Sequence, residues 1–146
     1  MKFLHPLTVV ALGVALSVAA IAAPVVVKNR PMGMPTTIHM RPQNGSQQLG
    51  TATLRDVAGA VQVEIHLANV PSGASEPAHI HIGTCAVLNP HPYIALANVI
   101  NGNSMTLIPK TAVPGGVSVA KLLRSHYAIN VHDAKNLKRY VSCGNI

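Results

Sequence analysis

Hydrophobic and polar residues alternate along several short stretches of the chain. In residues 61–67, valine, isoleucine and leucine occupy every second position, with Gln62, Glu64 and His66 between them. Residues 127–132 alternate in the same way. Successive side chains of a strand point to opposite faces, so a period of two is typical of strands with one face toward a core. The pattern predicts an all-β chain, with His66 on the solvent face of its strand.

Glycine and proline residues separate these stretches and predict the turns between them. One hairpin is expected from strands at residues 50–56 and 61–67, and a second one turns at Asn101-Gly102-Asn103. Residues 118–125 have helical spacing, enough for two turns behind a Ser118 cap. We predict a small antiparallel β-sandwich or β-barrel with one short helical turn. The other expected elements are strands at 36–40, 78–82, 105–113 (with Pro109 at an edge or bulge), 127–132 and 140–143, and loops at 71–77, 89–92 and 133–139.

The N-terminal residues predict export. A small positive start precedes an apolar run at residues 7–22, which ends in the small residues Ala20 and Ala22. The protein would then be secreted or periplasmic. The alternative is an uncleaved membrane anchor, because residues 7–27 carry no charge and are about long enough to span a bilayer. The expected organisation is a signal peptide at 1–22, a flexible N-terminal arm at 23–48 and the β-domain at 49–146.

Charge and cysteine content narrow the functional classes. The 146 residues carry a formal net charge of +7, with 10% charged and 3% aromatic residues. The basic residues are dispersed and have few aromatic neighbours that could stack on bases, which argues against a nucleic-acid partner and favours a surface that attracts small anions. Cys85 and Cys143 are the only cysteines. In an oxidising compartment such a pair is more often a structural disulfide than a redox couple.

Histidines on two of the predicted strands suggest a metal site. In the strand at 78–82, Ile80 and Ile82 can enter a core while His79 and His81 share the other face. In the strand at 127–132, His132 lies on the face opposite the hydrophobic residues. If the two strands meet, three imidazoles converge, and a disulfide between the cysteines that follow them would pin the segments together.

Neutral imidazoles suit copper, zinc, iron or nickel, and three of them leave a position open for water or a small substrate. Few carboxylates lie near these residues in the sequence, which favours one copper ion over zinc. His91 follows on a loop stiffened by Pro90 and Pro92, where it could cap the metal or remain in solvent. No catalytic residue is assigned. The competing interpretation is that the His-x-His motif is an ordinary surface feature of a strand.

The motifs together resemble the copper/zinc superoxide dismutase superfamily from about Gly50 to Ile146. The resemblance rests on Pro77-Ala78-His79-Ile80-His81, Cys85, Ala128-Ile129-Asn130-Val131-His132 and Cys143-Gly144-Asn145-Ile146. It implies a Greek-key barrel and superoxide as a substrate. It further implies copper ligands at His79, His81 and His132, an intrasubunit disulfide between Cys85 and Cys143, and a role for His91 as the histidine that bridges copper and zinc.

The chain also departs from that family. No histidine or acidic residue lies between Pro92 and Ser125, so the family's zinc site is absent, as in its copper-only branch. The segment before Cys143 is short, and Tyr140 stands where the family has its substrate-guiding arginine. Arg139 is one position away, which places it on the other face of a strand. The chain is also similar to exported domains related to both dismutases and chordin-type modules. Three functions stay open: a copper dismutase, a non-catalytic copper-handling module and a structural domain without metal.

Overall fold

The computed structural model describes residues 33–146. The expected signal peptide at 1–22 and the first part of the expected arm lie outside these residues. Within the described part of the chain, no helix has the length and apolar character needed to cross a membrane.

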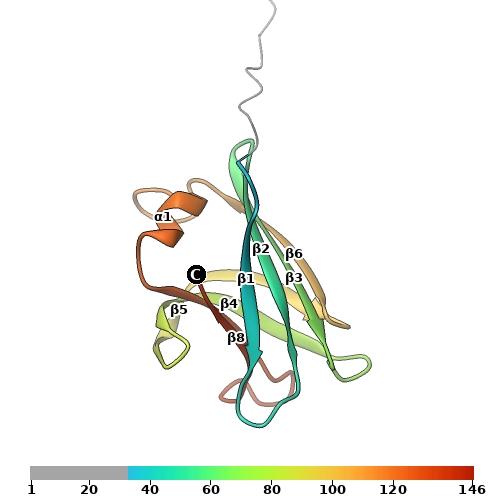
Figure 1. Cartoon of the computed structure of the whole chain (residues 1–146). Helices are drawn as coiled ribbons and strands as arrows, with labels where there is room; N and C mark the ends of the chain where they lie inside the picture. The colour runs from blue at the N-terminus through green and yellow to red at the C-terminus, as the bar shows by residue number, and fades with distance from the viewer. Residues whose placement is uncertain (1–32) are drawn as a thin grey trace, which may run out of the picture.

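The described residues form eight β-strands and one short helix (Figure 1), which confirms the all-β prediction. The hairpin predicted from residues 50–56 and 61–67 is formed by the second and third strands. The elements are β1 (Thr36–Pro42), β2 (Leu49–Val57), β3 (Ala60–Ala68), β4 (Ser75–Thr84), β5 (Val87–Ile100), β6 (Asn103–Pro109), α1 (Val119–Leu123), β7 (Tyr127–His132) and β8 (Tyr140–Asn145).

The strands close into one antiparallel barrel in the order β1-β2-β3-β6-β5-β4-β7-β8. Strands β4, β5 and β6 follow one another through hairpins, and β7 then returns to pair with β4. This return is the Greek-key connection. The last strand, β8, pairs with both β7 and β1 and so closes the barrel. Figure 1 shows β8, in dark red, beside β1, in blue-green.

The barrel interior follows the alternation of the sequence. Every second residue of β3 is buried, from Val61 to Leu67, and the residues between them are more exposed. His66 is exposed, and its Nδ1 lies 2.8 Å from Asn103 Oδ1, which confirms its place on the surface. Fully burying one aliphatic side chain contributes about 1.5–3 kcal/mol. Such residues line the interior from both sides of the barrel, among them Leu54, Val61, Val63, Ile65, Ile80, Ile129 and Val131.

The strand expected at 36–40 is β1, and it belongs to the barrel. Strand β1 pairs with β2 on one side and with β8 on the other, and its Ile38 and Met40 are buried. The domain therefore starts at Thr36, within the segment expected to be a flexible arm, and not at Leu49. Without β1, strands β2 and β8 would each keep an unpaired edge of backbone hydrogen-bonding groups.

Residues 89–92 were expected to form a loop but lie within β5. Strand β5 is in register with β6 only at Ile100, so much of its other edge makes no ladder, and β-bulges flank the pairing of His81 with Pro92. Proline is tolerated at free edges and bulges because a ladder N–H is not required there. Ile82 was expected in the core but is 46% exposed. It lies in this irregularly paired part of β4.

The short helix was predicted correctly. The Ser118 side chain accepts a hydrogen bond from the Lys121 backbone N–H, which caps the helix, and Val119 and Leu122 are buried. The strand expected at 105–113 is β6, which ends at Pro109.

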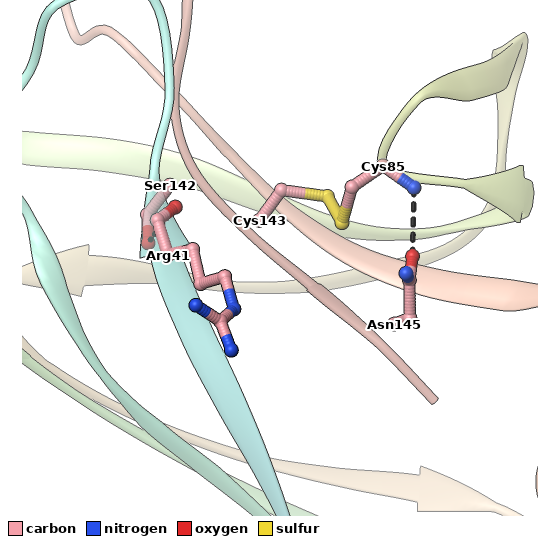
Figure 2. The surroundings of a disulfide bond; sticks show 5 residues. All are labelled: Arg41, Cys85, Ser142, Cys143 and Asn145. Carbon is pink, nitrogen blue, oxygen red and sulfur yellow. Dashed lines mark hydrogen bonds between the residues drawn. A yellow bond between two sulfur atoms is a disulfide. The ribbon is translucent and has the colours of Figure 1, made fainter.

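A disulfide joins Cys85, in the turn after β4, to Cys143 in β8, as predicted. The two Cα atoms lie 5.8 Å apart. Figure 2 shows the bond together with the hydrogen bond from the Cys85 backbone N–H to Asn145 Oδ1, 2.7 Å long. The turn after the histidine strand is thus fixed to the C-terminal strand by one covalent bond and one hydrogen bond.

The variant Cys85→Ala/Cys143→Ala should lose about 4 kcal/mol of unfolding free energy. The bond closes a loop between residues 58 positions apart, and its removal returns that loop entropy to the unfolded chain. Urea denaturation of both proteins measures the difference. Reduced wild-type protein is the control and should show the same loss. A loss below about 1 kcal/mol would contradict the prediction.

Candidate metal centre

The pairing of β4 with β7 brings three histidines together. His79 and His81 lie on the outer face of β4, opposite Asn130 and Ala128 of β7, and His132 ends β7. Their ring centroids are 5.7 Å apart for His79 and His81, 5.0 Å for His79 and His132, and 6.0 Å for His81 and His132. One ligand nitrogen of each residue lies within 4.8 Å of those of the other two. The predicted convergence is confirmed, and the three residues are close enough to bind one metal ion.

Two backbone carbonyls decide which nitrogens face the cluster. His81 Nδ1 lies 2.8 Å from the Asn89 carbonyl oxygen, and His132 Nδ1 lies 2.6 Å from that of Leu137. A carbonyl oxygen only accepts, so both Nδ1 atoms donate, and in the neutral ring the lone pair is then on Nε2. Carbonyl partners of this kind orient metal-binding histidines in many proteins.

Three nitrogens of the cluster have no hydrogen-bond partner. They are His79 Nδ1, His81 Nε2 and His132 Nε2, and all three are buried atoms without a partner among the described residues. Buried polar atoms in proteins are nearly always paired, because an unpaired one costs about 1–3 kcal/mol. Three unpaired nitrogens at one place are the arrangement that a metal ion would satisfy.

The cluster also favours the neutral imidazole, which is the form that binds metal ions. Burial lowers the pKa of His79, and the neighbouring His132 and His81 lower it further. Burial is also the main cause of the lowered pKa of His81, with a smaller effect of His132, while its hydrogen bond to the Asn89 carbonyl acts in the opposite direction. Both rings therefore remain neutral at lower pH than an exposed histidine would.

The cluster contains only imidazole donors. No carboxylate belongs to it among the described residues, and the two cysteines are joined as a disulfide. His91, the predicted fourth ligand, is exposed on β5, and the structure does not bring it into the group. Asn89, two residues before His91, contacts the cluster because its carbonyl accepts a hydrogen bond from His81 Nδ1. The fit to copper, zinc, nickel or iron thus rests on three neutral nitrogens.

Asn130 is a residue of this site for which the sequence pattern indicated no role. It is fully buried, both its amide nitrogen and its amide oxygen lack a partner among the described residues, and it pairs with His79 on one side and Cys143 on the other. Alternation places its side chain on the face of His132. The alternation in the sequence predicts burial of only the inner face of β7. In the structure the outer face is buried as well, along the whole strand.

Tyr140 and Arg139 also take distinct places at this site. The Tyr140 ring stands edge-on to His132, with the ring centroids 5.1 Å apart. The Arg139 guanidinium forms an ion pair with Asp133, 2.9 Å long, and donates to the Asn44 carbonyl at 3.2 Å. The Tyr140 ring thus lies against His132, while the Arg139 cation is paired with Asp133 within the β7–β8 loop.

Comparisons of the chain with protein-family models, curated proteins and solved structures return no match.

The stability of the metal-free protein should fall as the pH drops below about 6.5, the ordinary value for histidine. Below it the unfolded chain binds protons at His79 and His81 that the folded chain does not, because their folded pKa values are lowered, and this favours unfolding. Urea denaturation between pH 7.5 and 5 measures the slope. His79→Asn/His81→Asn should flatten it, whereas the exposed control His126→Asn should not. Equal dependence of stability on pH in all three proteins would show that the folded-state pKa values of His79 and His81 are not lowered.

Asn130→Leu should raise the unfolding free energy of the metal-free protein by about 1–3 kcal/mol. Leucine has nearly the same shape as asparagine and removes two buried polar atoms that have no partner. Thermal or urea unfolding measures the gain. Asn98→Leu, at an exposed asparagine of β5, is the control and should give none. A loss of stability in Asn130→Leu would mean that the amide has a partner in the folded protein.

Proposed function

We propose that the protein is an exported copper-binding domain of the superoxide dismutase type that dismutates superoxide. The observation that carries the proposal is the convergence of three buried, unpartnered nitrogens, one each from His79, His81 and His132. These are the residues that the resemblance assigns as copper ligands. The closed Greek-key barrel and the disulfide between Cys85 and Cys143 support the same interpretation.

Copper is the metal that fits this donor set best. Neutral imidazoles stabilise both Cu(I) and Cu(II), and no thiolate or carboxylate joins them among the described residues. A structural zinc site would normally be closed by a fourth protein ligand. Three ligands instead leave room for water or a small anion, and the basic surface of the chain attracts anions.

Bound copper would supply one-electron chemistry, in which one superoxide is oxidised to dioxygen and a second, with two protons, is reduced to hydrogen peroxide. The protein's part is to hold the donor atoms. The Asn89 and Leu137 carbonyls fix the His81 and His132 rings with Nε2 toward the cluster. His79 is partly exposed, whereas His81 and His132 are buried.

Export is supported by the same features. A disulfide is stable in oxidising compartments and rare in the cytosol, and the apolar N-terminal run has the pattern of a secretory leader. We therefore place the domain outside the cytoplasm.

A second candidate is a copper-handling module without turnover. It is favoured by the environment of Arg139 and Tyr140. The Arg139 cation is neutralised by Asp133, and the side chain against His132 is the Tyr140 ring, which carries no positive charge to guide superoxide. Both candidates require the same copper site and differ only in catalysis.

Calorimetric titration of the metal-free protein with Cu(II) should give one bound ion per chain. His79→Ala/His81→Ala should lower the affinity at least about a hundredfold, since two of the three donors are lost. His91→Ala is the matched control, because His91 is exposed and lies outside the cluster, and it should bind as the wild type does. Absence of stoichiometric binding would refute the copper site, and loss of affinity in His91→Ala would show that it is a fourth ligand.

The dismutation rate of the copper-loaded protein separates the two candidates. If the domain is an enzyme, its rate per copper ion exceeds that of the double variant carrying the same amount of copper at its surface. Equal rates, together with stoichiometric copper binding by the wild type, would establish the non-catalytic module.

A further inference from the structure

A cavity of about 700 Å³ lies at the end of the barrel where three loops meet. Its lining comes from residues 46–48 before β2, from Asn69 and residues 71–74 of the β3–β4 loop with the first two residues of β4, and from part of the β7–β8 loop with Val141. None of the three cluster histidines belongs to its lining. Its volume is within the range of small-molecule sites.

Hydrogen bonds between the loops hold the walls of this cavity in place. Asn69 Nδ2 donates to the Gln47 carbonyl at 2.9 Å, and Asn44 Nδ2 donates to the Tyr140 carbonyl at 3.1 Å. The Ser46 hydroxyl donates to the Val141 carbonyl. The β1–β2 loop is thereby tied to the β3–β4 loop and to the start of β8. The cavity is formed in the folded protein and needs no rearrangement to exist.

A buried polar pair, Gln48 and Glu76, lines the cavity. The two residues are 3% and 2% exposed, and Gln48 Nε2 donates to Glu76 Oε1 at 2.7 Å. Their remaining oxygens, Gln48 Oε1 and Glu76 Oε2, are buried without a partner among the described residues. Burial and the charge of Asp133 raise the pKa of Glu76, against the opposing effect of the Gln48 hydrogen bond. When Glu76 is ionised, both free oxygens are acceptors, and a positively charged donor would compensate the buried carboxylate.

The β7–β8 loop supplies positive charge to the same cavity. Lys135 is exposed, lines the cavity and forms no ion pair among residues 33–146. Arg139 also lines it, but its charge is taken up by Asp133. The cavity therefore combines a buried carboxylate that has no cationic partner with an exposed ammonium that has no anionic partner.

We propose that this cavity binds a small zwitterion such as an α-amino acid. The ligand's ammonium group donates to Glu76 Oε2 and Gln48 Oε1, and its carboxylate pairs with Lys135. The site requires neither copper nor the proposed dismutase activity. It gives the domain a second ligand, recognised by two opposite charges at the two ends of one molecule.

NMR titration of the whole, metal-free chain with glycine tests this site, because amide shifts report weak binding residue by residue. Glycine should shift the amides of residues 69–76 and 133–139 and reach saturation. Butylamine, which offers only the cation, and propionate, which offers only the anion, should each bind at least about tenfold more weakly. Equal binding of propionate and glycine would overturn the zwitterion assignment, as would a lack of saturable shifts with glycine.

Substitutions of Glu76 and Lys135 test where the two ends of the ligand bind. Glu76→Gln should weaken glycine binding at least about tenfold and raise the unfolding temperature at neutral pH, because a buried carboxylate becomes a neutral amide of the same shape. Lys135→Gln should weaken binding about fivefold, whereas Lys138→Gln, in the same loop but outside the lining, should not. Unchanged glycine binding in Glu76→Gln would overturn the proposal. His79→Ala/His81→Ala should bind glycine normally, so failure of the copper site and failure of this site are distinguishable.

Discussion

The antiparallel pairing of β4 with β7 is the interaction on which the site depends. It aligns His79 with Asn130 and His81 with Ala128, although the two segments are far apart in the sequence. Because side chains on neighbouring strands share a face, this register alone brings the imidazoles of β4 beside the end of β7. A shift of one residue would turn His79 and His81 toward the barrel interior and replace them on the outer face with isoleucine. The aliphatic core therefore fixes the histidine cluster as firmly as it fixes the barrel.

The outer face of β7 has an unusual degree of burial. All six residues of the strand are buried, including Asn130 and His132. Burial on both faces has two effects on the histidines: it disfavours their protonated forms, and it leaves their cluster-facing nitrogens without water as a partner. The backbone carbonyls of Asn89 and Leu137 satisfy the other nitrogens of His81 and His132. The site thus combines paired atoms on its outside with unpaired ones at its centre.

Much of this arrangement could be predicted from the sequence, because alternation at a period of two reports which face of a strand is buried. It located the hairpin of β2 and β3, the extent of β7 and the faces of the three histidines. It predicted a strand at 36–40 but could not report the pairing of that strand with distant segments, so this part of the chain was assigned to the arm although Ile38 and Met40 of β1 complete the core. Pro90 and Pro92 led to the prediction of a loop at residues 89–92, but the largely free edge of β5 accommodates both prolines within the strand. The carbonyl partners, the burial of Asn130 and the cavity at Glu76 arise from loops, whose paths leave no periodic signal.

The β7–β8 loop contributes to both the histidine cluster and the cavity beside Glu76. Its Leu137 carbonyl orients the His132 ring, while its Asp133, Lys135 and Arg139 line the cavity beside Glu76. A change in the backbone path of this segment will therefore alter imidazole geometry and cavity shape together. By thermodynamic reciprocity, any influence that an occupant of the cavity exerts on metal affinity is matched by an equal influence of the metal on that occupant.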